Sequence, residues 1–254
     1  PTVTTDSVCV GSAGTLFVNN VGAGGSYLWN TGATTASLNI TPTATTTYSV
    51  VCTSANGCVS PSVSGTIVVK PYPVITTAND TICIGGSTTL NTNVDLPGGS
   101  YSWTPISATS SSITVSPAAT TNYTVIYNLL GCQDTASATV LVNPIPVVQT
   151  SNAVMCFGDV INLIASANLP GGTFLWSTNE TNDTISISPA SNSTYTVTYT
   201  LNNCTSPAAT AQVTVHPIPV VTLTSATICE GDPVTLTATP DLLGGSYAWG
   251  PNGI

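Results

Sequence analysis

The stretch Gly98-Gly99-Ser100-Tyr101-Ser102-Trp103 recurs along the chain and organises it. Near copies occupy residues 24–29, 171–176 and 244–249, and the four tryptophans are 74, 73 and 73 residues apart. These motifs contain all four tryptophans of the 254-residue sequence. Self-similarity at a fixed period of this length is typical of tandem arrays, in which one structural unit is repeated. The sequence therefore predicts a repeat protein, and its architecture must be settled before any local feature is interpreted.

The repeats meet at short joints that contain Pro-x-Pro. Three complete repeats are predicted, and the fourth contains only the first half of the pattern: residues 1–70 (repeat 1), 71–143 (repeat 2), 144–216 (repeat 3) and 217–254 (repeat 4). A Pro-x-Pro joint is extended and stiff, because proline restricts its own φ and the residue before it. We therefore expect a semi-rigid rod, and we interpret the sequence as a segment of a longer protein.

The chain carries very little charge. It has one cationic side chain, Lys70, and ten acidic residues, which give a formal net charge of −9. Binding to the phosphates of nucleic acid requires lysine and arginine, so a nucleic-acid partner is excluded. No apolar run approaches the ~20 residues that span a bilayer, so no membrane span is expected. The abundance of threonine and valine, with almost no lysine, glutamate or arginine, favours β-strands over helices.

Each repeat contains six or seven short strand-like segments separated by turns rich in glycine, proline and asparagine. In repeat 2 the expected strands are 74–77, 88–93, 101–104, 112–116, 123–127 and 138–142. This pattern predicts an all-β fold made of immunoglobulin-like β-sandwiches. A tryptophan on the third strand and a tyrosine that opens the penultimate strand are the expected core anchors. They are Trp29, Trp103, Trp176, Trp249, Tyr48, Tyr123 and Tyr195.

Seven of the eight cysteines fall at two recurrent positions of the repeat. Cys9, Cys83, Cys156 and Cys229 precede the first turn, and Cys58, Cys132 and Cys204 follow the penultimate strand. This regularity predicts disulfides and an oxidising, extracellular compartment. A metal site is less consistent with the sequence, because there is no Cys-x-x-Cys pair and the one histidine, His216, lies at a joint.

Two pairing schemes remain open. Within repeats the pairs would be Cys9–Cys58, Cys83–Cys132 and Cys156–Cys204; between neighbouring repeats they would be Cys9–Cys132 and Cys83–Cys204. The second scheme arises because the first and last turns of a sandwich lie at opposite ends, whereas a disulfide needs Cα atoms within about 7 Å. The eighth cysteine, Cys52, replaces an aromatic residue on a strand, and we expect it to be a buried free thiol.

Neither a catalytic nor a metal site is predicted. His216 has no carboxylate nearby in sequence, so a Ser-His-Asp triad has no support. Calcium needs six to eight oxygens, whereas the acids here are scattered and are typical of turns. Glu180 and Asp183 are the nearest approach to a cluster, and they occur in one repeat only. We therefore expect no enzyme activity and no cofactor, calcium being the one ion that the acids would suggest.

The combined pattern extends over the whole chain. It consists of Cys-x-Gly, a leucine on the second strand, Gly-Gly-x-(Tyr/Phe)-x-Trp, a proline that closes an alternating strand, Tyr-x-Val and a late cysteine. This set resembles the PKD-like and Ig-like repeats of very large surface proteins of the Bacteroidota, including gliding-motility adhesins and cargo of the type IX secretion system. The resemblance implies secretion, exposure at the cell surface, and a role in adhesion, gliding motility or an extracellular filament.

The same resemblance implies O-glycosylation at Asp-(Ser/Thr)-apolar tripeptides. Four of the eight aspartates precede such a site, and the candidate residues are Ser7, Thr81, Thr135 and Thr184. Chance matches are also expected, because threonine is so common here. Ser7 and Thr81 share one repeat position, which favours modification.

The leading hypothesis is a structural and adhesive stalk of a giant cell-surface protein. Its partners would be neighbouring repeats, other copies in a filament, and surface polysaccharide or a substratum bound through other regions. A second hypothesis is that the repeats themselves bind polysaccharide by stacking sugars on an exposed row of tryptophans. A third is that they are spacers in a secreted hydrolase.

Overall fold

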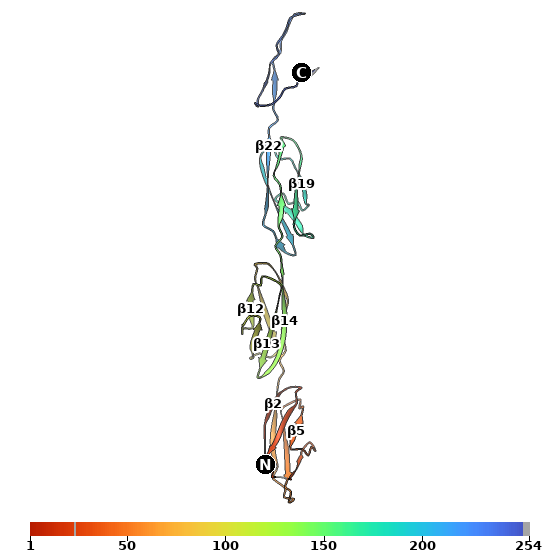
Figure 1. Cartoon of the computed structure of the whole chain (residues 1–254), viewed down its shortest axis with the longest axis vertical. Helices are drawn as coiled ribbons and strands as arrows, with labels where there is room; N and C mark the ends of the chain where they lie inside the picture. Colours follow the sequence, from red (N-terminus) through yellow and green to blue (C-terminus); the bar gives the residue numbers. More distant parts are fainter. Residues whose placement is uncertain (23, 251–254) are drawn as a thin grey trace. The chain divides into compact units, whose positions relative to one another are not determined.

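The computed structural model describes residues 1–22 and 24–250, and it contains strands β1 to β24. The chain divides into two compact units, Pro1–Asn143 and Pro144–Ile254. The end of repeat 4, residues 251–254, lies outside the described residues. Figure 1 shows separate sandwiches of strands succeeding one another along the chain.

Repeat 2 is a sandwich of two sheets with seven strands. The smaller sheet has the order β12-β10-β8 and the larger one β11-β13-β14-β9. The strands are β8 (Ile75–Thr77), β9 (Asp80–Cys83), β10 (Thr88–Val94), β11 (Ser100–Thr104), β12 (Ser112–Val115), β13 (Thr121–Leu129) and β14 (Cys132–Asn143). Each expected strand overlaps an observed one, although β14 begins at Cys132 and is much longer than the expected 138–142, and the immunoglobulin-like sandwich is confirmed.

One strand of repeat 2 was not predicted. β9 leaves the smaller sheet and pairs in parallel with β14, with Asp80 beside Val140 and Cys83 beside Asn143. The paired residues of β9 and β14 are 60 residues apart in sequence, so no local sequence pattern predicts that these two strands pair. The equivalent parallel pairs are β2 (Asp6–Cys9) with β7 (Val63–Lys70) in repeat 1, and β16 (Ala153–Cys156) with β22 (Ala209–His216) in repeat 3.

Repeats 1 and 3 have the same arrangement of strands in two sheets as repeat 2. In repeat 1 the orders are β1-β3-β5 and β2-β7-β6-β4, and in repeat 3 they are β15-β17-β19 and β16-β22-β20-β18. The short β21 (Cys204–Thr205) continues the last hairpin of repeat 3. The strands of repeat 1 are β1 (Thr2–Val3), β2 (Asp6–Cys9), β3 (Gly14–Asn19), β4 (Ser26–Trp29), β5 (Ser37–Ile40), β6 (Thr46–Thr53) and β7 (Val63–Lys70). Those of repeat 3 are β15 (Val148–Thr150), β16 (Ala153–Cys156), β17 (Ile161–Ala167), β18 (Thr173–Trp176), β19 (Thr184–Ile187), β20 (Ser193–Leu201) and β22 (Ala209–His216).

Over residues 217–250, repeat 4 forms one hairpin with flanking segments. β23 (Val221–Leu223) pairs with β24 (Ala238–Pro240). Leu236 is 45% exposed, whereas the leucines at its position in the complete repeats are at most 2% exposed. Trp249 is likewise only half-buried. The half repeat thus leaves uncovered the side chains that form the core elsewhere.

The tryptophans are the centres of the three cores. Trp29, Trp103 and Trp176 are at most 2% exposed. Each indole N–H donates to a backbone carbonyl of the following loop at 2.9–3.0 Å, so the buried polar atom is satisfied. A row of exposed tryptophans that could stack sugars is therefore not formed by these residues. Among the expected tyrosine anchors, Tyr48 and Tyr123 are buried, but Tyr195 is only partly buried.

The two glycines of the recurrent motif are required for different physical reasons. Gly98 has φ of +104°, which favours glycine at that turn. A Cβ on Gly99 would lie 2.4 Å from the carbonyl oxygen of Asn128 and 2.6 Å from the ring of Tyr127. The Tyr127 hydroxyl accepts from the Gly99 N–H at 2.7 Å and donates to the Leu96 carbonyl at 2.7 Å. The Gly-Gly pair thus lets the turn pack directly on a buried tyrosine of β13.

Candidate functional site

The two recurrent cysteine positions lie at opposite ends of each sandwich. In repeat 2, Cys83 pairs beside Asn143, the last residue of β14, whereas Cys132 is its first residue. Twelve residues of strand at roughly 3.3 Å each separate the two ends by nearly 40 Å. The within-repeat pairs Cys9–Cys58, Cys83–Cys132 and Cys156–Cys204 are therefore not formed, since a disulfide spans only a few ångströms between Cα atoms.

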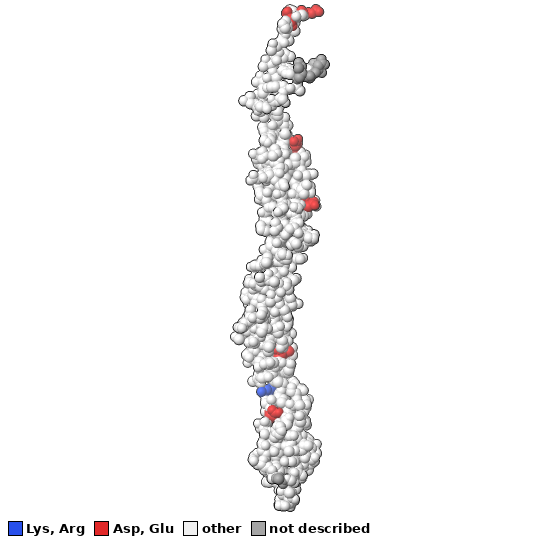
Figure 2. Space-filling view, in the orientation of Figure 1, with Lys and Arg blue, Asp and Glu red and all other residues white. Residues whose placement is uncertain are grey.

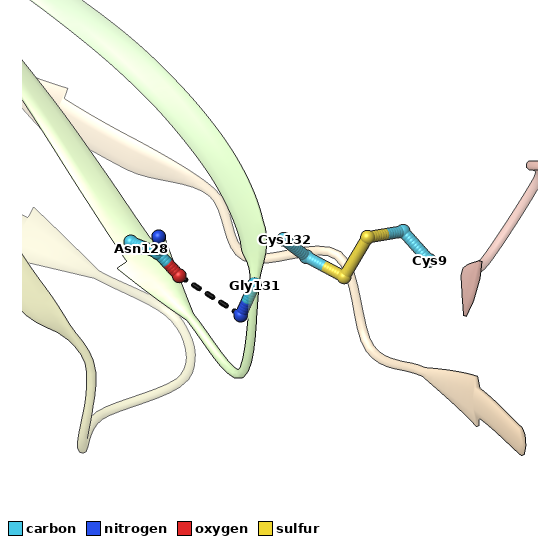
Figure 3. The surroundings of a disulfide bond; sticks show 4 residues. All are labelled: Cys9, Asn128, Gly131 and Cys132. Carbon is cyan, nitrogen blue, oxygen red and sulfur yellow. Dashed lines mark hydrogen bonds between the residues drawn. A yellow bond between two sulfur atoms is a disulfide. The ribbon is translucent and has the colours of Figure 1, made fainter. Parts of the chain in front are cut away.

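Instead, a disulfide joins repeat 1 to repeat 2. Cys9 and Cys132 are bonded with a Cα–Cα distance of 5.7 Å, across 123 residues of sequence. Cys9 lies beside Lys70, where the chain leaves repeat 1. Figure 3 shows the bond between Cys9 and the last hairpin of repeat 2. This covalent bridge beside the joint is the candidate functional site.

The hairpin that carries Cys132 has a two-residue turn. Leu129 pairs with Cys132, and the intervening Leu130 and Gly131 have φ of 55° and 93°. Positive φ at both central residues is typical of a type I′ turn, which matches the twist of the two strands. The Gly131 N–H donates to the Asn128 side chain at 2.9 Å (Figure 3). Cys132 thus follows a turn of defined geometry, which fixes its position at the end of the sandwich where the chain enters repeat 2.

Lys70 and Asp134 also lie close to this joint. A Cβ on Gly131 would be 3.8 Å from the Nζ of Lys70, so the last side chain of β7 reaches close to the hairpin of repeat 2. The Asp134 carboxylate accepts from the backbone N–H of Ile75 at 2.9 Å and so ties the entry of repeat 2 to β14. Sequence reasoning missed both contacts. Lys70 could have pointed to a contact at this joint, because it is the only lysine or arginine of the sequence and lies at the end of a predicted repeat.

The other cysteines differ in state. Cys83 and Cys204 are each disulfide-bonded. Cys52 is a free thiol, 4% exposed, within the core of repeat 1. Cys58, Cys156 and Cys229 are free and exposed.

The aspartates of the glycosylation tripeptides have structural partners. The Asp6 carboxylate accepts from the backbone N–H groups of Thr15 and Ser7, both at 2.7 Å, and these bonds, that of Thr15 first, lower its pKa. The hydroxyl of Thr88 and then the N–H of Thr81 lower the pKa of Asp80 in the same way. Asp6 and Asp80 thus tie β2 and β9 to the start of the next strand, which is a structural reason for their recurrence. Of the candidate acceptors, Ser7, Thr81 and Thr135 are exposed and Thr184 is half-buried.

The surface has few charges over the face drawn in Figure 2. Within residues 1–22 and 24–250, no three histidine, cysteine or acidic side chains lie close enough together to hold a metal ion. In the same residues, no helix has the length and apolar character needed to cross a membrane.

No protein-family description and no curated protein matches the chain. Solved structures of tandem immunoglobulin domains are similar to it. The titin domains I67–I69, as an E-to-A mutated variant, share 12% identity with a TM-score of 0.47, covering 84% of this chain and 96% of that one. Domains 3–5 of Drosophila OTK share 10% identity with a TM-score of 0.41, covering 84% and 94%. Domains 1–5 of Sidekick-1 share 14% identity with a TM-score of 0.33, covering 85% and 58%.

Proposed function

We propose that the chain is a stalk segment of a secreted cell-surface protein, built from immunoglobulin-like repeats that are stapled to one another. The observation that carries the proposal is the disulfide between Cys9 and Cys132, because it links two sandwiches and not two sheets of one sandwich. A bond in this place restricts bending at the joint. The repeats 1–70, 71–143, 144–216 and 217–254 are its successive domains.

The same bridge is proposed for the next joint. Cys83 and Cys204 occupy the repeat positions of Cys9 and Cys132, and both are disulfide-bonded. Pairing between them would staple repeat 2 to repeat 3. Peptide mapping without reduction tests this pair directly, and a linkage of either cysteine to another partner would contradict it.

A stalk of this kind serves adhesion, gliding motility or an extracellular filament at the surface of a bacterium. Its uncharged faces limit unspecific contact with charged polymers. Sugars on Ser7, Thr81, Thr135 and Thr184 would add solvated cover to these faces. Intact-mass measurement of the natively secreted protein is expected to show added mass that maps to these residues, and an unmodified mass would contradict the glycosylation.

The stiffness of the stalk is tested with the double variant Cys9→Ser/Cys132→Ser. Loss of the bridge is expected to broaden the distribution of end-to-end lengths, measured on single molecules by electron microscopy and in solution by small-angle X-ray scattering. The matched control is Cys52→Ser, which removes a buried thiol without touching a joint. An unchanged distribution in the double variant would mean that the proline joints alone stiffen the chain, and the stapled-stalk proposal would fail.

A further inference from the structure

The covalent path through repeats 1 and 2 is much shorter than the chain itself. The bond between Cys9 and Cys132 joins residues that are 123 apart in sequence, so residues 10–131 form a closed loop. A path from Pro1 to Asn143 can therefore run along residues 1–9, cross the two sulfur atoms, and continue along β14. Tension on the ends of a looped chain is carried by the shorter covalent path as soon as that path is fully extended.

Residues 1–9 cross repeat 1 from one end to the other. Pro1 lines a surface pocket together with Cys58, at the end of the sandwich that holds the last hairpin. Cys9 lies at the opposite end, where it pairs beside Lys70, the last residue of β7. Between Pro1 and Cys9 the chain forms β1 and β2, so this segment crosses the repeat without a hairpin.

β14 crosses repeat 2 in the same way. It is one continuous strand of 12 residues, from Cys132 at the bridge to Asn143, where the chain leaves the repeat. A β-strand rises about 3.2–3.4 Å per residue, and a fully extended chain spans at most about 3.3–3.6 Å per residue. A strand is therefore already within about a tenth of its maximum length. The path through the bridge thus has almost no slack within either repeat.

We propose that residues 1–9, the disulfide between Cys9 and Cys132, and β14 form a load-bearing path that carries tension past the cores of repeats 1 and 2. While the bridge is closed, the two repeats cannot lengthen appreciably under tension. Trp29 and Trp103, at the centres of the two cores, lie in the loop that bears no load. The proposal rests on the bridge that the stalk function uses, and it extends that function from bending to stretching.

The loop provides two measurable quantities. Its 123-residue separation corresponds to roughly 400 Å of extended chain, which only an open bridge releases. It also contains Cys52, a free thiol that is 4% exposed in the core of repeat 1. The reactivity of Cys52 therefore reports whether tension has opened that core.

Optical tweezers test the proposal on the full chain. One handle is attached to the N-terminus and the other to an azide introduced by Ile145→azidohomoalanine, at a joint residue that is 40% exposed. The test chain carries Cys83→Ser/Cys204→Ser, so that the bridge between Cys9 and Cys132 is the one under load. The matched control carries Cys9→Ser/Cys132→Ser in addition. Exposed thiols are blocked with iodoacetamide beforehand, and a fluorescent maleimide is supplied under tension.

The two chains are compared at a tension that unfolds the unbridged control. The control is expected to lengthen about sixfold, because residues 1–145 all become extended, and its Cys52 becomes labelled. The bridged chain is expected to lengthen by less than about a quarter, and its Cys52 stays unlabelled. Labelling of the bridged chain in denaturant without tension shows that the maleimide reacts with Cys52 once the core is open.

Two results would overturn the proposal: lengthening of the bridged chain by more than about a quarter, or labelling of its Cys52 at that tension. If the unbridged control does not fold, the bridged chain alone decides between the outcomes, with tension raised until the handles detach. The stalk function is judged instead on the bending of the unloaded chain, so either proposal can fail without the other.

Discussion

At the scale of single residues, Gly99 shows how closely β13 approaches the turn before it. Its N–H is bonded to the Tyr127 hydroxyl, and its missing side chain leaves room for the Asn128 carbonyl. Gly172 has the same setting with Thr200 and Tyr199. The second glycine of the motif is therefore required by packing, whereas the first is required by its backbone conformation.

Gly99→Ala is expected to destabilise repeat 2 by about 1–3 kcal/mol, because the new methyl group overlaps backbone and ring atoms that cannot move apart freely. Urea unfolding of the full chain measures the change. Gly245→Ala is the matched control, since it alters the same motif position in repeat 4 and a Cβ there meets nothing within 4 Å. Equal effects of the two substitutions would refute the packing explanation.

Asp6 and Asp80 make stability depend on pH. Hydrogen bonds to their carboxylates lower both pKa values in the folded state, below the usual value of 3.8. The unfolded state therefore binds protons first as the pH falls, and the stabilisation is present above pH ~4 and is lost as the pH falls through the lowered pKa values. The urea midpoint of the wild-type chain is expected to decline in this range. Asp6→Asn/Asp80→Asn is expected to lower the midpoint at neutral pH and to flatten the decline; an unchanged slope would contradict the assignment.

At the scale of elements, the last hairpin presents the bridging cysteine. Repeat 3 has Asn202 and Asn203 at the turn positions, with φ of 49° and 62°, where repeat 2 has Leu130 and Gly131. Asparagine tolerates the left-handed region better than leucine does. Repeat 2 therefore carries local strain beside its disulfide that repeat 3 avoids.

A reciprocal exchange tests this strain. Leu130→Asn is expected to stabilise repeat 2 by up to about 1 kcal/mol, and Asn202→Leu is expected to destabilise repeat 3 by a similar amount. Urea unfolding monitored by hydrogen exchange assigns each change to its repeat. Destabilisation by both substitutions would show instead that Leu130 contributes through packing at the joint.

At the scale of the whole molecule, we expect the disulfide between Cys9 and Cys132 to affect the stiffness of the array more than the stability of each sandwich. The described bridge lies between repeats, and each of the three complete cores is closed by a tryptophan and its neighbouring strands. Removing a disulfide from within a small domain typically costs about 2–5 kcal/mol. The bond between Cys9 and Cys132 instead connects two successive repeats.

Reduction with dithiothreitol is therefore expected to change the unfolding free energy of the individual sandwiches by clearly less than the ~2 kcal/mol typical of an internal disulfide. Thermal unfolding with and without reductant measures the effect, and the Cys9→Ser/Cys132→Ser variant should reproduce it for repeats 1 and 2. A loss as large as that of an internal bridge would show that the folding of neighbouring repeats is strongly coupled.

The amino-acid pattern was sufficient to predict the tandem repeats, most strands and the tryptophan cores. These features depend on the local alternation of apolar and polar residues, on turn residues, and on the spacing of Trp29, Trp103 and Trp176. All three can be read directly along the sequence. Even the buried thiol of Cys52 follows from its place on a strand.

The partner of Cys9 required the three-dimensional arrangement. Its position depends on the parallel pairing of β2 with β7, which places Cys9 at the exit of repeat 1 and leaves Cys58 at the far end. It also depends on the turn that brings Cys132 to the entry of repeat 2. Neither the pairing of strands distant in sequence nor the contact between two domain ends produces a periodic pattern in the amino-acid sequence. The sequence therefore left both disulfide schemes open, and the tertiary structure decided between them by placing each cysteine at one end of its sandwich.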